Sequence, residues 1–235
     1  NKDLGFDTGA VVKIQINNVA VRNKLESFKE RLEQSPFVTS ATLMTGEPGG
    51  FHDATIISTM KDGQEEDYRV RIAVADEDYL TTFGIQTVAG RNFSEDLQSE
   101  RGKTAIINER AMKLMGLTAE EVLSKQFNLR SFGLENLRIV GIAKDYHFTS
   151  LKNEIEPLVI VNADARWRCG IKVNGQNLAA SMQSVVEIWE EFTKDFPMQY
   201  TFLDDSQAQL YETETKQEKV FTAFSGISIF LACMG

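Results

Sequence analysis

Apolar and polar positions alternate with two different periods along this chain, and together they predict a mixed α+β fold. A period of two residues, typical of a strand, appears at residues 11–16. A helical period follows at residues 21–34, where apolar side chains recur on one face. Both patterns return late in the chain, with strands expected at residues 157–161, 168–173 and 199–203 and a helix at residues 178–192.

The middle of the chain adds further strands and shorter helices. Strands are expected at residues 38–44, 54–60, 67–75, 104–107 and 137–143. The dipeptide Asp62-Gly63 favours a hairpin turn between the second and third of these. Asn108 is a candidate N-cap, and Thr118 with Glu121 fits the capping box of a further short helix.

The order of these elements predicts two lobes. The opening order is strand, helix, strand, strand and strand, and the closing order of strand, strand, helix and strand complements it, so we expect both chain ends to build one layer. Residues 1–76 and 157–204 then form the first lobe, and residues 77–156 form an inserted second lobe. Residues 205–235 are expected to be a helix that stands below the first lobe as a stalk.

The last seventeen positions, KVFTAFSGISIFLACMG, are the most apolar stretch of the chain. No charged residue follows Lys219. A membrane-crossing helix needs roughly 20 apolar residues, so this stretch is interpreted either as the truncated start of a transmembrane helix or as a buried C-terminal helix. The chain also lacks an initial Met and an apolar signal segment, and we expect it to be part of a longer polypeptide.

Charge and cysteine content exclude some classes of function. The formal net charge is −9, and no cluster of Lys and Arg with interleaved aromatic residues occurs, so a general nucleic-acid binder is excluded. Cys169 alternates with apolar residues and is expected to be buried, whereas Cys233 lies in the apolar tail. The two cysteines therefore make a poor disulfide pair.

Candidate chemistry is sparse. The chain contains no phosphate-binding loop, no nucleophile elbow and no zinc-binding helix motif. His52 lies beside Asp53 in a glycine-rich loop that we expect to be solvated, and His147 follows Asp145 in the run KDYHF. A structural role for His147 is the main interpretation, and a proton-transfer role with Asp145 is the alternative. We expect no catalytic residue, cofactor or metal.

Several blocks resemble a known family. They read NKDLGFDTG, DEDYLTTFGIQTVAGRNF, TAIINERAMKLMG, LRIVGIAKDYHFTSLKNEIEPLVIV and FLDDSQAQLYETETKQEKVFTAFSGISIFLACMG. In this order they resemble the MacB-type periplasmic core domain of ABC-transporter permeases in the MacB/FtsX-like family. The resemblance spans almost the whole chain.

This resemblance implies a fold class and a function. The fold would be α+β and two-lobed, with a porter-like βαβ lobe formed by both chain ends, an inserted Sabre-like lobe and a C-terminal stalk helix. The domain would face the periplasm from the bacterial inner membrane, between the first and second transmembrane helices of the permease. It would couple cytoplasmic ATP hydrolysis to the export or extraction of cargo by transmitting motion.

The resemblance also implies partners. These are a cytoplasmic ATP-binding subunit or domain, a second permease copy and, in some relatives, a periplasmic adaptor or a lipoprotein or peptide cargo. No nucleotide-binding motif occurs in this chain, so any ATPase lies outside it. A ligand-sensing extracytoplasmic domain of a membrane receptor is the alternative function.

Two sets of residues are the candidate interaction sites. The long glycine-rich loop is expected to be an exposed surface for partner contact or, alternatively, a mobile turn; its candidate residues are Thr45, Gly46, Glu47, Pro48, Gly49, Gly50, Phe51 and His52. The stalk is expected to couple the domain to the membrane, and its candidate residues are Asp205, Gln209, Leu210, Tyr211 and Glu214.

Overall fold

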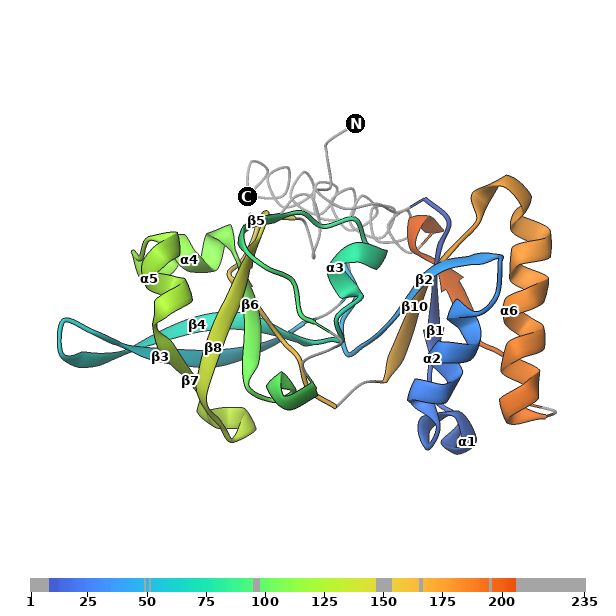
Figure 1. The fold of residues 1–235 in the computed structure, drawn as a ribbon, viewed down its shortest axis with the longest axis horizontal. Coiled ribbons are helices and arrows are strands. Elements are labelled where there is room, and N and C mark those ends of the chain that lie inside the picture. Colours follow the sequence, from blue (N-terminus) through green and yellow to red (C-terminus); the bar gives the residue numbers. More distant parts are fainter. Residues whose placement is uncertain are drawn as a thin grey trace, which may run out of the picture.

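The computed structural model describes residues 9–48, 50, 52–94, 98–146, 154–164, 167–194 and 196–205. The strands are β1 (Val11–Gln15), β2 (Val38–Met44), β3 (Asp53–Lys61), β4 (Gln64–Val74), β5 (Thr87–Gly90), β6 (Thr104–Asn108), β7 (Gln126–Leu129), β8 (Leu134–Ala143), β9 (Leu158–Val161), β10 (Arg168–Val173) and β11 (Tyr200–Phe202). The α-helices are α1 (Val19–Arg22), α2 (Leu25–Glu33), α3 (Tyr79–Thr82), α4 (Glu109–Met115), α5 (Ala119–Ser124) and α6 (Leu178–Thr193). Two sheets lie side by side along the long axis of the molecule, with α3 between them (Figure 1).

The first sheet is built by both ends of the chain. Its four strands have the order β11-β1-β10-β2, and all neighbours are antiparallel. Helices α2 and α6 pack on one face, where Phe28 and Trp189 are fully buried with ring centroids 5.8 Å apart. This is a split βαβ arrangement, in which each helix connects two strands that have a third strand between them. Both ends of the chain thus contribute strands to this one sheet.

The second sheet closes on itself. Its order is β5-β8-β6-β9-β4-β3-β7, and β7 also pairs with β8, so six strands form a ring and β5 extends the edge of β8. Alternate residues of all six strands point into the ring and form one apolar cluster with α4 and α5, which includes Ile57, Ile72, Ile107, Phe127, Ile139 and Val159. The inner core of this lobe is therefore the interior of a small closed sheet.

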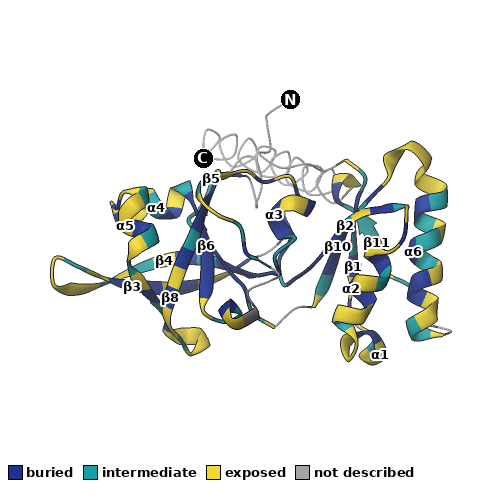
Figure 2. Ribbon diagram, in the orientation of Figure 1, coloured by how far each residue is buried: buried dark blue, intermediate teal, exposed yellow. Residues whose placement is uncertain are grey.

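A second cluster of apolar side chains joins the two sheets. It contains Tyr79, Leu80 and Phe83 of the α3 region, Met44 of β2, and the outward-facing Ile106 of β6. Figure 2 shows buried residues running through α3 and the strand ends on either side of it. The two lobes therefore share a continuous apolar core through α3.

The sheets divide the chain differently from the predicted lobes. Strands β3 and β4 and strand β9 were expected in the layer of the chain ends, but all three belong to the closed sheet. Boundaries at residues 76 and 157 therefore cut through the closed sheet. The reason is nonlocal, because β4 pairs in parallel with β9, and a parallel pairing across such a sequence separation leaves no local signal.

Turns and helix caps, which depend on residues close together in the sequence, agree with the predictions better than the lobe boundaries do. The turn between β3 and β4 has positive φ at Asp62 and Gly63, as a tight hairpin requires. Asn108 caps α4 by accepting from Ala111 N at 3.0 Å, and Thr118 with Glu121 forms the predicted capping box of α5. Strand β7 was not predicted. Within the described part of the chain, no helix combines the length and apolarity that crossing a membrane requires.

Candidate functional site at the junction of the two sheets

The junction is built where the chain passes from one sheet to the other. The chain leaves the first sheet after β2 and returns to it before β10. Backbone hydrogen bonds tie the strand ends together, from Thr45 N to Val74 O at 2.8 Å and from Trp167 N to Met44 O at 3.0 Å. Ala75 N donates to Val161 O at 3.0 Å, so strands of both sheets meet in one hydrogen-bonded network.

The loop after β2 contains a buried carboxylate. Glu47 is 4% exposed and lies 2.7 Å from Lys13 Nζ and 3.2 Å from Arg168 Nη1. Burial favours the protonated acid, but the hydrogen bond from Lys13 and the charges of Lys13 and Arg168 together outweigh it and hold the pKa of Glu47 below its ordinary value. Because Lys13 lies on β1 and Arg168 on β10, this ion cluster holds the loop against the first sheet.

His52 closes the same loop on the side of the second sheet. It is 3% exposed, its Nδ1 lies 3.2 Å from Gly50 O, and its own carbonyl accepts from Arg71 Nη1 at 3.1 Å. Burial lowers the pKa of His52 to about 4, although Gly50 and Glu47 oppose the shift, so the ring is neutral near neutral pH. The ring packs on the backbone of Gly46, where a Cβ atom would lie 2.9 Å from Nε2.

The expectation of an exposed loop is therefore wrong for its described residues. Gly46, Glu47, Pro48 and His52 are buried, and Thr45 and Gly50 are intermediate, whereas Gly49 and Phe51 lie outside the described residues. The loop composition suggested solvation, but Gly46 admits the ring of His52 and a pair of cations neutralises the carboxylate. Contact of this loop with a partner stays a prediction.

A second ion cluster joins α2 to the segment between β4 and α3. Lys29 Nζ lies 3.1 Å from Asp76 Oδ2 and 2.5 Å from Asp78 Oδ2. Glu77 is also within 3.4 Å of the same ammonium. The side chains of Lys29 and Asp76 are only 6% and 1% exposed, which makes this a buried ion pair.

Asp76 is held by the first sheet as well. Its carboxylate accepts from Thr42 Oγ1 at 2.6 Å and from Leu43 N at 2.8 Å, both on β2. Burial raises the pKa of Asp76, while Lys29 and Thr42 oppose that shift. For Lys29, burial alone would lower the pKa, but Asp76 and Asp78 outweigh it and the pKa is raised, so the amine is charged.

The run after β8 has structural contacts in the described residues. Asp145 accepts from Arg110 N at 2.8 Å, and Tyr146 is buried with its hydroxyl 3.4 Å from that of Tyr79. Tyr79 in turn donates to Gly46 O at 3.1 Å, which ties α3 to the loop after β2. His147, the alternative proton-transfer residue, lies outside the described residues.

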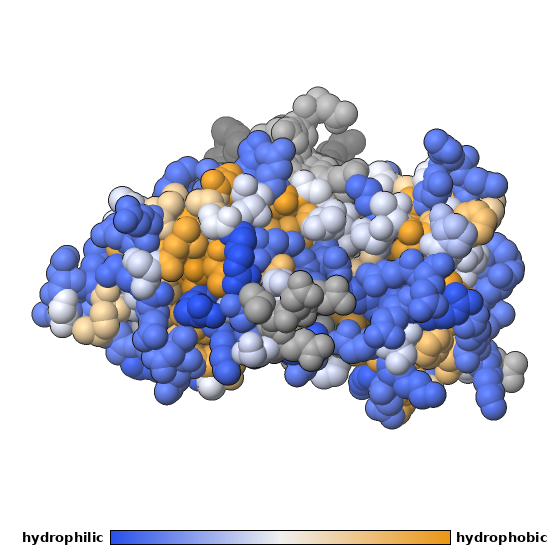
Figure 3. Space-filling model, in the orientation of Figure 1, coloured by the Kyte–Doolittle hydropathy of each residue, from blue (hydrophilic) through white to orange (hydrophobic). Residues whose placement is uncertain are grey.

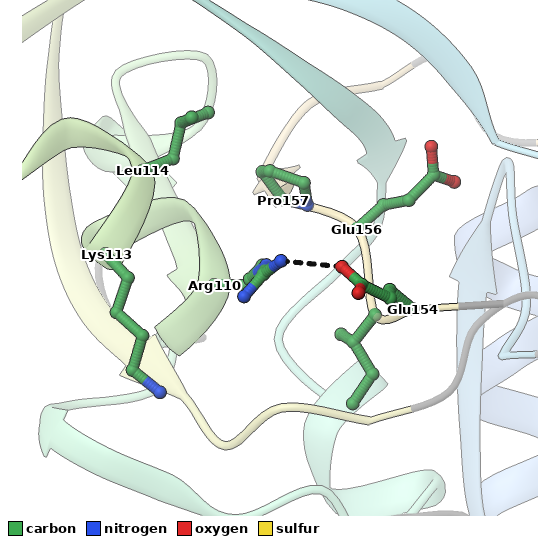
Figure 4. Close-up of a pocket in the computed structure, with 7 residues that line it drawn as sticks. Arg110, Lys113, Leu114, Glu154, Glu156 and Pro157 are labelled. Carbon is green, nitrogen blue, oxygen red and sulfur yellow. Dashed lines mark hydrogen bonds and ion pairs between the residues drawn. The ribbon is translucent and has the colours of Figure 1, made fainter.

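Cavities are small and open. One of about 400 Å³ lies beside α4, and Arg110 at its centre pairs with Glu154 at 2.9 Å (Figure 4). Another, of about 390 Å³, lies at the junction and is lined by Trp167, Phe132 and His52, among others. Trp167 is 51% exposed rather than packed in a core, and Arg22 lies over its ring at 5.4 Å. No group of three or more His, Cys, Asp or Glu in the described ranges could hold a metal ion.

Residues 5–188 match the family described as MacB-like periplasmic core domain. The chain belongs to this family. The resemblance drawn from the sequence blocks is therefore confirmed. No curated protein sequence matches the chain.

Solved structures share the MacB-like fold at low sequence identity. The periplasmic region of MacB from Actinobacillus actinomycetemcomitans has a TM-score of 0.57 at 14% identity, over 88% of this chain and 94% of that chain. A domain of a putative permease protein from Porphyromonas gingivalis has a TM-score of 0.53 at 16% identity, over 85% and 91%. The extracellular domain of the noncanonic ABC-type transporter YknZ from Gram-positive bacteria has a TM-score of 0.53 at 14% identity, over 81% and 98%.

The predicted stalk is described only at its start. Leu203, Asp204 and Asp205 have helical backbone directly after β11. Gln209, Leu210, Tyr211 and Glu214, together with the apolar tail, lie outside the described residues. Leu203 is 1% exposed and belongs to the apolar cluster between the two sheets, a contact that the sequence did not predict.

Proposed function

We propose that this chain is the extracytoplasmic domain of an ABC-transporter permease in the bacterial inner membrane and faces the periplasm. In this proposal the domain is non-catalytic and couples cytoplasmic ATP hydrolysis to the export or extraction of cargo by transmitting motion. Its partners are the ATP-binding subunit or domain and a second permease copy. Membership of the MacB-like family is the observation that carries the proposal.

The arrangement of the chain ends supports coupling. Strands β1 and β11 are antiparallel neighbours, with Val12 opposite Phe202, so the chain enters and leaves the first sheet side by side. A domain inserted between two neighbouring membrane helices needs this geometry. Movement of either helix would act on adjacent strands of a single sheet.

The apolar core supports transmission beyond that sheet. Val11, at the start of β1, and Leu203, directly after β11, both belong to the cluster that contains α3 and outward-facing residues of the closed sheet. Protein interiors are close-packed and transmit strain. A displacement of the chain ends would therefore reach both lobes through direct contact.

Thiol labelling in intact cells tests the location. A cysteine in place of the exposed Glu120 of α5, in a chain with Cys233→Ser, should react with a membrane-impermeant maleimide without cell lysis. Native Cys169 is fully buried and serves as the unreactive internal control. Labelling that requires lysis would contradict a periplasmic domain.

A helix-breaking substitution tests the coupling. Gln209→Pro in the predicted stalk should preserve ATP hydrolysis by the assembled transporter but abolish its effect on the periplasmic side, because proline interrupts helical hydrogen bonding. Gln209→Ala is the matched control and should behave as wild type. Full transport activity in the proline variant would refute the stalk as the coupling element.

A further inference from the structure

The polar contacts between α2 and the segment after β4 point to a role beyond the apolar core. Lys29 extends from α2, on one face of the first sheet, to carboxylates that lead into α3. Strand β2 is an edge strand of that sheet, and Asp76 covers its edge, because Asp76 N donates to Leu43 O at 3.1 Å while its carboxylate accepts from Leu43 N. The contact therefore holds the edge of one sheet against the segment that leaves the other.

The charge balance makes this contact specific to one geometry. A buried ammonium and a buried carboxylate each lose hydration, and their attraction compensates only while they remain together. Rotation of the closed sheet away from α2 would pull the segment that carries Asp76 from both Lys29 and the edge of β2, which hold the same buried carboxylate. An apolar interface can slide by small steps, whereas a buried ion pair with fixed hydrogen bonds has one favourable position.

We propose that Lys29 and Asp76 form an electrostatic clamp that fixes the angle between the two sheets, so that the domain moves as one rigid body. The clamp itself rests only on the observed contacts, and its part in transmitting motion rests on the proposed function. Asp78 and Glu77 supply further negative charge at the mouth of the clamp, where their side chains are 35% and 16% exposed.

A surface ion pair on the same helix provides a matched control. Arg31 of α2 pairs with Glu191 of α6 at 2.9 Å, but the two side chains are 40% and 47% exposed. Both of these helices pack on the same sheet. Arg31→Met therefore removes an ion pair from α2 without touching the contact between the sheets.

Spin-label distances on the isolated 235-residue chain test the clamp. Labels replace the exposed Glu120 of α5 and the exposed Glu190 of α6, one in each lobe, in a chain with Cys233→Ser. Cys169 needs no replacement, because burial raises the pKa of its thiol and keeps it unreactive. Pulsed electron double resonance then reports the distance between the lobes.

The wild type, Lys29→Arg and Arg31→Met should each give one narrow distance. Lys29→Met should lose that single distance and give a broad or shifted distribution under conditions in which the chain is folded. The double variant Lys29→Met with Asp76→Asn leaves no unpaired buried charge and guards against simple unfolding. It should broaden the distribution as well, with a circular dichroism spectrum like that of the wild type.

A wild-type distribution in both Lys29→Met and the double variant would overturn the clamp, even if their unfolding midpoints were lowered, because a merely stabilising contact changes the midpoint alone. A broad distribution in the wild type would also overturn it. Neither result depends on an assembled transporter. Failure of the clamp therefore leaves the proposed function standing, and failure of the thiol-labelling test leaves the clamp standing.

Discussion

Burial of His52 predicts a specific loss of stability in mild acid. The folded state holds this ring with a pKa of about 4, whereas an unfolded histidine has its ordinary value near 6.5. Between these two values the unfolded chain binds a proton that the folded chain does not. Stability is therefore complete above the unfolded pKa and falls as the pH drops toward the folded pKa.

The magnitude follows from proton linkage. Lowering the pH from about 7.5 to about 5 should remove about 2 kcal/mol from the free energy of unfolding, and the full shift corresponds to about 3 kcal/mol. The acidic groups act differently in this window. The pKa of Glu47 is lowered, so its contribution is lost only at more acidic pH. The pKa of Asp76 is raised in the folded state, so its protonation favours folding as the pH falls and partly offsets the loss of stability caused by His52. This offset is the same in every variant that retains Asp76.

Urea unfolding at several pH values measures the effect, with the fluorescence of buried Trp189 as one probe. His52→Asn keeps a neutral hydrogen-bond donor in the loop and should be less stable than the wild type near neutral pH, but with a flatter pH profile. The only other histidine is His147, so His147→Asn is the control and should keep the wild-type slope. Equal slopes for His52→Asn and the wild type would refute the buried neutral imidazole.

Three further substitutions, one of them with a matched control substitution, test the packing by thermal or urea unfolding. Trp189→Ala should lower the free energy of unfolding by about 3–5 kcal/mol, because it empties a fully buried site and removes the indole N–H that donates to Phe196 O at 2.8 Å. A decrease below about 1 kcal/mol would contradict this packing. Gly141→Ala should lower the free energy of unfolding by about 3 kcal/mol, because its Cβ would lie 2.1 Å from Arg91 O. The control Gly175→Ala meets only an ordinary contact and should leave the free energy of unfolding nearly unchanged. Equal effects of the two substitutions would refute the close approach of β5 to β8. Asn108→Ala should lower the free energy of unfolding by about 2 kcal/mol or more, because this side chain caps α4 and also accepts a hydrogen bond from Leu158 N. A decrease of only a few tenths of a kcal/mol would contradict both contacts.

Elements with a local cause could be predicted from the sequence. The face shared by Val12, Ile14 and Ile16 lies in the core under α2 and α6, and Cys169 is buried there as expected. The short helices also begin where their capping residues indicate. Strand β7 was missed because only Phe127 and Leu129 alternate within its four residues, which is too short a pattern to distinguish from a loop.

The junction could not be predicted in the same way. Lys29 and Asp76 are far apart in the sequence, and each by itself looks like a solvated charge on a helix or turn. Their burial arises only after β2 and β4 come together through Met44 and Ala75. The lobe boundary was missed for the same reason, because the membership of β3, β4 and β9 in the closed sheet depends on pairings between distant segments.

The surface gives one further distinction between the lobes. In the view of Figure 3, apolar atoms gather over the region of β5, β6 and β8, while the face over α2 is mainly hydrophilic. Val88 of β5 is 48% exposed in this lobe. The label position Glu120 lies in the same lobe, on α5, and therefore reports movement of the lobe that contains the closed sheet.

In the proposed function, motion of the chain ends moves the whole domain. Spin labels at Glu120 in the two copies of the assembled transporter report this motion as a change in the distance between them, measured with and without nucleotide trapped by vanadate. Trapping should shift this distance between copies, while the distance from Glu120 to Glu190 within one copy should stay constant. An unchanged distance between copies, with nucleotide demonstrably trapped, would contradict the proposed motion.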